Sequence, residues 1–375
     1  MRHHTVRGTA SLITATAATI LIVLALAGCA VIGASPTSSA QASATPSAPP
    51  RSDSPTPDPS EEPADPDVNH VATGLAVVRP PSADSPLTEV FVVRRDGSLR
   101  QVTGLAADDR MGGALPVWSP DGSMIAFGPS FLGSNAFPAQ LLVNADGTGQ
   151  RLVHQFDVEE FSRASWSSDG RFMVFADATP PGDRRIWLAD VTTGQVTRIG
   201  TGSSPNWVAG DAQIGFMSGV TGLVPGQPQA LTMVAFVMDR DDLQPREFAR
   251  ADNAFWSPDG SAVLLEQDGV LSLADADGSN RRVMGEGGLA SWSPDGQRFA
   301  YLSGSDDSGR SLIAVMDRDG TEIWSGVAGS APAWSSDGSR LAVEVSYPSP
   351  VVRVLDATTG EQLWETEGEH PAWRP

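Results

Sequence analysis

Lysine is absent from this 375-residue chain, and cysteine occurs only once. The 25 basic side chains are therefore all arginine, against 45 aspartate and glutamate residues, which gives a formal net charge of −20. Nucleic-acid binding requires a basic surface that neutralises phosphates, so this balance argues against DNA or RNA as a partner. A single cysteine excludes an internal disulfide and any Cys-x-x-Cys zinc motif.

Residues that commonly carry catalysis are also scarce. From residue 71 onward the chain contains only His154 and His370, with His70 at the edge of this region. The sequence has neither a Gly-x-Ser-x-Gly nucleophile elbow nor a His-x-x-Glu-His zinc motif. We therefore expect no catalytic residue, no metal site and no cofactor, and we interpret the protein as a binding protein and not an enzyme.

The N-terminus has the pattern of a lipoprotein signal peptide. Arg2 and Arg7 precede an apolar run, Ser11 to Ala27, which is slightly shorter than the roughly 20 residues of a membrane span. The run ends in Leu26-Ala27-Gly28-Cys29, which resembles the bacterial lipobox. That resemblance implies a signal peptide over residues 1–28 and lipidation of Cys29. A transmembrane anchor with an incidental cysteine, or cleavage elsewhere, is the alternative.

Residues 29–70 are composed almost wholly of Ser, Pro, Thr, Ala, Asp and Glu after the cysteine. Such a segment has too little apolar surface to offset the entropy of ordering, and its prolines favour a partly extended spacer. We expect a disordered tether that holds a globular head at the extracytoplasmic face of the cell membrane. The lysine-free, Ala- and Pro-rich composition resembles that of actinobacterial proteins.

From residue 71 onward a short motif recurs. Its clearest copy is Trp118-Ser119-Pro120-Asp121-Gly122, followed by the apolar strand Met124-Ile125-Ala126-Phe127. Proline has its φ fixed near the turn value and glycine accepts positive φ, so the motif predicts a tight hairpin turn. The spacing of the tryptophans is close to the roughly 40–45 residues of a four-stranded propeller blade. The repeated tryptophans are Trp118, Trp166, Trp207, Trp256, Trp292, Trp334 and Trp373.

The two ends of this region complement each other. Its N-terminal part contains predicted strands near residues 74–78, 89–93 and 99–103 but no leading tryptophan. Pro371-Ala372-Trp373-Arg374 supplies the missing first strand. We therefore predict an all-β, seven-bladed β-propeller over residues 71–375, closed by pairing of its terminal strands. Six or eight blades are the alternatives. The tryptophans are expected to wedge between neighbouring blades.

Two aspartate-rich segments partly match a calcium-binding loop. Asp275-Ala276-Asp277-Gly278 has Glu286 at the twelfth place, whereas Asp317-Arg318-Asp319-Gly320 has Ala328 there. Glycine stands at the fourth place and not the sixth, and no flanking helices are expected. We therefore interpret both segments as hairpin turns.

The Trp-Ser-Pro-Asp-Gly turn with its Ile-Ala-Phe-like strand resembles the repeat of the TolB-like, WD40-like β-propeller family. The resemblance extends over residues 71–375, but the Gly-His and Trp-Asp pairs of eukaryotic WD repeats do not recur. Propellers of this family occur in partner-binding periplasmic proteins, in surface lipoproteins and as gating domains of peptidases. The resemblance thus implies the fold and leaves the function open.

Long connections between strands indicate a binding face. The four longest segments, residues 103–115, 128–140, 154–165 and 218–229, are expected on one face of the disc and on neighbouring blades. Function concentrates in such loops. Folding of the apolar loops back over the rim, and simple solvation of the acidic one, are the alternatives. The candidate partner-binding residues are Phe131, Leu132, Phe137, Leu223, Val224, Asp157, Glu159 and Glu160.

Together these features predict a membrane-anchored, extracytoplasmic lipoprotein whose propeller binds an envelope protein or polymer. The alternative is a propeller enzyme, a hydrolase or lactonase-like protein with a metal in the central channel. A third hypothesis is a structural role in which the propeller only spaces or caps an assembly.

Overall fold

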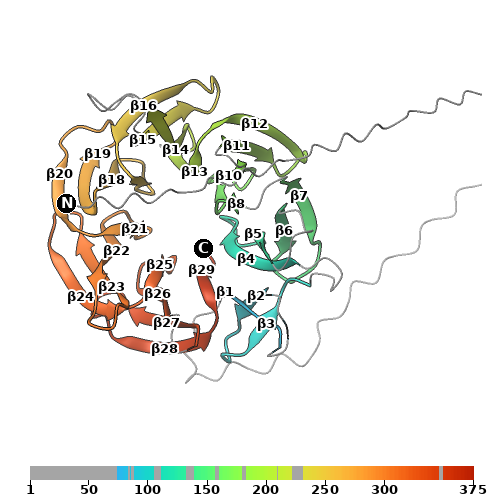
Figure 1. The fold of residues 1–375 in the computed structure, drawn as a ribbon. Helices are drawn as coiled ribbons and strands as arrows, with labels where there is room; N and C mark the ends of the chain where they lie inside the picture. The colour runs from blue at the N-terminus through green and yellow to red at the C-terminus, as the bar shows by residue number, and fades with distance from the viewer. Residues whose placement is uncertain are drawn as a thin grey trace, which may run out of the picture. The chain divides into compact units, whose positions relative to one another are not determined.

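Seven β-sheets arranged as a ring make up the described part of the chain (Figure 1). The computed structural model describes residues 74–375 except 83–84, 86–87, 105–110, 132–138, 157–159, 180–182, 209, 222–230 and 346–348. The signal peptide and tether predicted for residues 1–70 lie outside this range. The described residues form strands and turns but no α-helix, and hence no helix there could span a membrane. The all-β, seven-bladed prediction is confirmed.

Blade 1 joins the two ends of the domain, as predicted. The C-terminal strand β29 (Glu369–Trp373) pairs antiparallel with β1 (Leu75–Arg79), and Trp373 lies opposite Leu75. Strands β2 (Glu89–Val93) and β3 (Leu99–Gln101) complete the sheet. This pairing closes the ring with seven sheets, which excludes the alternatives of six or eight blades.

The other blades follow in chain order, each with its first strand nearest the channel (Figure 1). Blade 3 differs, because two short strands share the inner position and both pair with β10. Blades 2, 3 and 4 contain β4 (Met111–Trp118), β5 (Met124–Phe131), β6 (Ala139–Asn144) and β7 (Arg151–Gln155); β8 (Glu160–Phe161), β9 (Ser165–Trp166), β10 (Phe172–Thr179), β11 (Asp183–Asp190) and β12 (Gln195–Thr201); β13 (Ser203–Val208), β14 (Gln213–Thr221), β15 (Leu231–Asp239) and β16 (Pro245–Arg250).

Blades 5, 6 and 7 are regular four-stranded sheets. They contain β17 (Asn253–Trp256), β18 (Ala262–Gln267), β19 (Val270–Asp275) and β20 (Arg282–Glu286); β21 (Gly288–Trp292), β22 (Arg298–Ser305), β23 (Ser311–Asp317) and β24 (Glu322–Ala328); β25 (Ser330–Trp334), β26 (Arg340–Val345), β27 (Val351–Asp356) and β28 (Gln362–Glu367).

Five blades share one hairpin turn between their first and second strands. In blade 2, Asp121 accepts hydrogen bonds from the Ser119 hydroxyl (2.6 Å) and the Ser123 amide (3.0 Å), and Gly122 takes a φ of 66°. The Ser119 hydroxyl and the Ser123 groups that donate to this carboxylate lower the pKa of Asp121 to about 2. The aspartate is therefore used by its own turn. The same serine–aspartate bond forms at Asp169, Asp259, Asp295 and Asp337.

The hydrophobic core is divided into seven clusters, one at each interface between neighbouring blades. Between blades 6 and 7, for example, Ala300 and Val315 of one blade pack with Trp334 and Leu341 of the other. No blade encloses a core of its own, because a single sheet must bury its apolar face against a second one.

The repeated tryptophans lie at these interfaces, as predicted, and four of them also bond across the interface. In each case the indole Nε1 donates to the carbonyl of the residue that precedes the tryptophan of the previous blade. The four bonds are Trp292 to Phe255 (2.8 Å), Trp334 to Ser291 (3.0 Å), Trp373 to Ala333 (3.0 Å) and Trp118 to Ala372 (3.1 Å).

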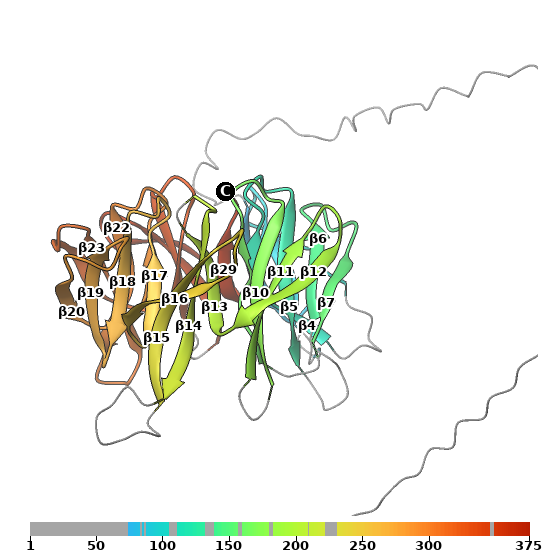
Figure 2. The ribbon, with the colours of Figure 1, turned by 90° about the horizontal axis from the view of Figure 1, so that it is seen from above.

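Blades 2, 3, 4 and 6 have long strands that project on one face, and those of blades 2 to 4 reach the lower edge of Figure 2. In blade 2, β5 runs to Phe131, while in blade 3 the β10–β11 hairpin pairs as far as Thr179 and Asp183. In blade 4 the β14–β15 hairpin pairs as far as Thr221 and Leu231. The four segments expected as loops are thus partly strand, because the hairpins continue beyond the sheet core.

Candidate functional site in the central channel

The first strand of most blades has a bulge where it borders the channel. Three residues before the tryptophan, five blades place a non-glycine residue at a φ near 50°, and the strand pairing shifts register there. Such a conformation costs about 1–3 kcal/mol, so its repetition shows that the surrounding sheet imposes it. The five residues are Leu115, Ser204, Leu289, Ala331 and His370.

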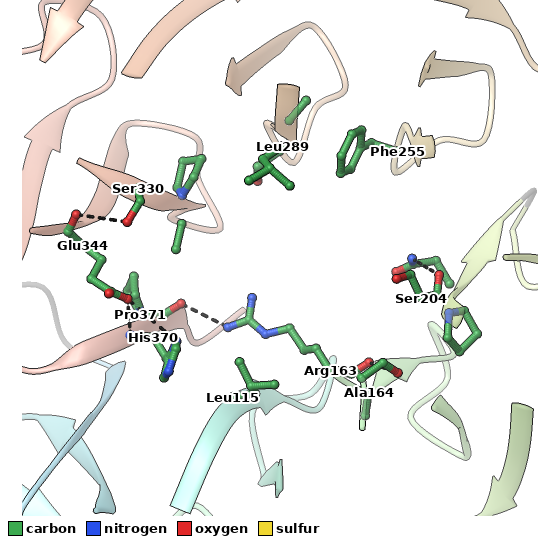
Figure 3. Close-up of a pocket in the computed structure, with 17 residues that line it drawn as sticks. Leu115, Arg163, Ala164, Ser204, Phe255, Leu289, Ser330, Glu344, His370 and Pro371 are labelled. Atoms are coloured by element: carbon green, nitrogen blue, oxygen red, sulfur yellow. Dashed lines mark hydrogen bonds and ion pairs between the residues drawn. The ribbon is translucent and has the colours of Figure 1, made fainter. Parts of the chain in front are cut away.

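These five residues help to line a cavity of about 640 Å³ to which all seven blades contribute (Figure 3). Because its walls are built near the starts of the inner strands, the cavity lies nearer the face that carries the long hairpins. Leu115, Phe255 and Leu289 provide apolar wall, and serines and Asn206 provide polar groups. The volume is within the range of about 300–1,000 Å³ that is usual for small-molecule sites.

Blade 3 contributes an arginine to this cavity. Arg163 stands between β8 and β9, three residues before Trp166, and its side chain extends across the channel (Figure 3). Its Nη2 donates to the carbonyl of Pro116 in blade 2 (3.1 Å) and to that of Pro371 in blade 1 (3.3 Å). Arg163 is exposed within the channel, although desolvation by the many protein atoms around it lowers its pKa. Among the described residues, no carboxylate forms an ion pair with this guanidinium.

Two glutamates, each on the second strand of its blade, accept hydrogen bonds from backbone amides in the bulge of the following blade. Oε2 of Glu344 accepts a hydrogen bond from the His370 amide (3.2 Å) and lies 3.7 Å from Nδ1 of the same residue. Oε2 of Glu266 likewise accepts from the Leu289 amide and from Nδ2 of Asn253, both at 3.1 Å. These carboxylates accept hydrogen bonds from backbone amides that the bulge takes out of the pairing between strands. They therefore fix the position of the bulged residues that line the channel.

Most of the predicted partner-binding residues lie outside the described residues. These are Leu132, Phe137, Asp157, Glu159, Leu223 and Val224. Phe131 ends β5 and Glu160 begins β8, and for both only the backbone is described. Their role in binding stays a prediction. Cys29, the predicted lipidation site, is also outside the described range.

The channel residues are not among those predicted from the sequence. One signal was available, because Arg163 is the only arginine found three residues before any of the repeated tryptophans. The equivalent positions hold Leu115, Ser204, Asn253, Leu289, Ala331 and His370. Without the bulge geometry, however, nothing indicates that this position points into the channel.

The described ranges contain no group of three or more His, Cys, Asp and Glu side chains that could hold a metal ion. The two calcium-like segments form turns, as expected. Asp277 accepts the amide of Ser279 and Asp319 that of Thr321, each at 2.9 Å. The carboxylates are therefore engaged by their own hairpins.

Sequence comparison gives one local likeness to a curated protein. Over 89 residues the chain is 39% identical to the Tol-Pal system protein TolB of Alcanivorax borkumensis, a match that covers 20% of this chain and 19% of that protein. The chain thus matches about a fifth of the length of this relative. No family model matches the sequence.

Solved structures share the propeller architecture. The oligogalacturonate lyase of Vibrio parahaemolyticus has a TM-score of 0.55 at 14% identity, over 72% of this chain and 83% of that one. The propeller domain of the Trilobed protease from Pyrococcus furiosus has a TM-score of 0.55 at 12% identity, over 78% and 95%. That domain has an open velcro topology, whereas here β29 and β1 pair. Such identities show the fold alone, and the chain has a TolB-like β-propeller fold.

Proposed function

We propose that this protein is a membrane-anchored, extracytoplasmic lipoprotein whose propeller binds a partner in the cell envelope and catalyses no reaction. Lipidation of Cys29 would anchor it, and the segment over residues 29–70 would space the propeller from the membrane. The lipobox-like sequence Leu26-Ala27-Gly28-Cys29 supports the anchor.

One observation carries the binding role. Three consecutive blades, 2 to 4, and blade 6 lengthen their hairpins on the same face, and the channel cavity lies near that face. The opposite face carries the tight Ser-Pro-Asp-Gly turns, in which the serine hydroxyl donates to the aspartate carboxylate of the same turn. A rigid scaffold with irregular extensions confined to one side is the usual arrangement of a binding surface. The partner would therefore contact blades 2 to 4.

The enzyme alternative rests on the fold that this chain shares with an oligogalacturonate lyase. At 14% identity that likeness transfers no activity. Metal analysis of the purified full chain distinguishes the two functions. Stoichiometric calcium, manganese or zinc that survives dialysis would favour the enzyme.

In-cell crosslinking followed by pull-down tests the proposed binding. We expect a specific envelope component to be recovered with the wild-type chain and lost when residues 130–138 and 222–226 are shortened. Asp277→Asn, in an exposed turn on the opposite face, serves as the control and should retain it. Equal recovery with the shortened and control variants would contradict the assignment of the face.

A Cys29→Ala variant tests the anchor separately. We expect it to leave the membrane fraction and to lose any partner that requires membrane proximity. A variant that stays in the membrane fraction would show that the apolar N-terminal segment, and not a lipid, holds the protein there.

A further inference from the structure

We propose that the channel cavity binds a small organic carboxylate with an apolar body, and that Arg163 is the residue that recognises its carboxylate. This site is distinct from the partner-binding hairpins. It requires neither the lipid anchor nor the envelope partner of the proposed function.

The first support is the bonding of the guanidinium. Both hydrogen bonds of Arg163 within the described residues use Nη2, and both acceptors are backbone carbonyls. Nη1 and Nε therefore remain available as separate donors, and each can donate a charge-assisted hydrogen bond to a carboxylate oxygen. The carbonyls of Pro116 and Pro371 fix the orientation of the guanidinium without neutralising its charge.

The second support is the charge around the cavity. Glu344 is the one carboxylate among the cavity-lining residues, and its Oε2 is already engaged by the amide and imidazole of His370. Arg163 is exposed within the channel, so its positive charge is accessible to an incoming anion. A single arginine suits a ligand with one negative charge.

The third support is the apolar part of the cavity wall. Leu289 is 55% exposed within the channel and, with Leu115 and Phe255, lines the same cavity as Arg163 (Figure 3). A leucine held at a left-handed φ and left uncovered offers an apolar surface to a ligand. With about 640 Å³ of space, the cavity can hold a phenyl or short alkyl body beside the charged group.

Isothermal titration of the full chain with 4-phenylbutyrate tests the site, and 4-phenylbutanol serves as the uncharged comparison. We expect binding of the carboxylate to be at least roughly tenfold tighter than binding of the alcohol, and Arg163→Gln to reduce it roughly ten- to a hundredfold. Arg298→Gln is the matched control, because Arg298 also donates to a carbonyl of the next blade, Gly338 at 2.8 Å, but does not line the cavity. It should leave the affinity unchanged.

Arginine modification of the wild-type chain gives a second test that does not depend on the folding of a variant. We expect 4-phenylbutyrate to slow phenylglyoxal addition at Arg163, as measured by peptide mapping, and to leave the rate at Arg298 unchanged. No binding, equal binding of acid and alcohol, or equal effects of the two substitutions would overturn the proposal. Stronger protection by inorganic phosphate than by 4-phenylbutyrate would also overturn the carboxylate assignment. Failure to recover any envelope partner with the wild-type chain, while that chain still binds 4-phenylbutyrate, would instead contradict only the proposed function.

Discussion

The ring has two arcs whose blades are joined in different ways. From blade 5 through blades 6, 7 and 1 to blade 2, an indole–carbonyl hydrogen bond crosses every interface. In the remaining arc, Nε1 of Trp166 and of Trp207 is buried without a partner among the described residues. At the interface of blades 4 and 5, the ring of Trp256 instead packs against the backbone of Gly215.

The irregular arc is also the one that carries the proposed sites. Its blades carry three of the four long hairpins, and in blade 3 the inner strand is divided into β8 and β9 with Arg163 between them. The Arg163 side chain links blade 3 to blades 2 and 1 through the carbonyls of Pro116 and Pro371. The blades that depart from the repeat are thus the ones that carry the proposed sites. This is expected, because functional sites often break the local rules that the rest of a fold obeys.

The largest effect is expected from deletion of residues 369–375. The deletion removes β29, the indole of Trp373 and the Ala372 carbonyl that Trp118 uses, so two of the four interface bonds disappear together. We expect the free energy of unfolding in urea to fall by several kcal/mol, with loss of cooperativity. Deletion of Pro375 alone is the control. Equal stability of the two truncated chains would show that closure of the ring contributes little.

A smaller loss is expected from Gly215→Ala in the irregular arc. The new Cβ would lie 2.6 Å from an atom of the Trp256 ring, which is packed between blades 4 and 5. Overpacking of this kind costs about 1–3 kcal/mol, and chemical denaturation measures it. Gly104→Ala places its Cβ in open space and should change stability by less than about 0.5 kcal/mol. Similar values for both would mean that the Trp256 interface is loosely packed.

Trp334→Phe and Trp166→Phe compare the two arcs directly. Both indoles are 8% exposed, but only Trp334 has a hydrogen-bonded Nε1. Replacement of Trp334 removes its hydrogen bond to the Ser291 carbonyl, whereas replacement of Trp166 removes a donor that lacks a partner among the described residues. We expect the first variant to lose about 1–2 kcal/mol more than the second in urea denaturation. A reversed order would contradict the distinction between the arcs.

The smallest effect is expected from acid titration of the turns. Because the pKa of Asp121 is lowered to about 2 from an ordinary value of 3.8, its bonds stabilise the fold fully above that ordinary value. The contribution is lost as the pH falls toward 2. We expect Asp121→Asn to reduce the fall in unfolding temperature between pH 5 and pH 2, relative to the wild-type chain. An unchanged pH profile would mean that the hydrogen bonds to Asp121 do not stabilise the folded chain relative to the unfolded chain.

Much of the architecture could be predicted from short-range patterns. The Ser-Pro-Asp-Gly turns were recognisable because proline, aspartate and glycine each meet a local backbone requirement. The closure was predictable because Trp373 lacked following strands and residues 74–78 lacked a preceding one. The continuation of strands into the segments around Phe131 and Thr221 was missed, since turn residues mark where a hairpin can end but not how far its pairing runs.

The candidate channel site could not be predicted in the same way. His370 was noted only as one of few histidines, and Arg163 was not noted at all. Both residues lie three positions before a repeated tryptophan. The structure shows that residues at this position line one cavity, because the inner strands are bulged there. The capping of the His370 amide by Glu344 of the preceding blade is likewise a contact between residues of separate strands.

The sequence by itself determined the repeat, the number of blades, the turns and the order of strands, because each depends on residues close together along the chain or on matching ends. Only the tertiary structure decided which side chains meet in the channel, which tryptophans are bonded, and that the channel arginine, Arg163, forms no ion pair with the described residues. Those properties depend on seven separate strands converging on one axis, and no local pattern specifies the distances between them.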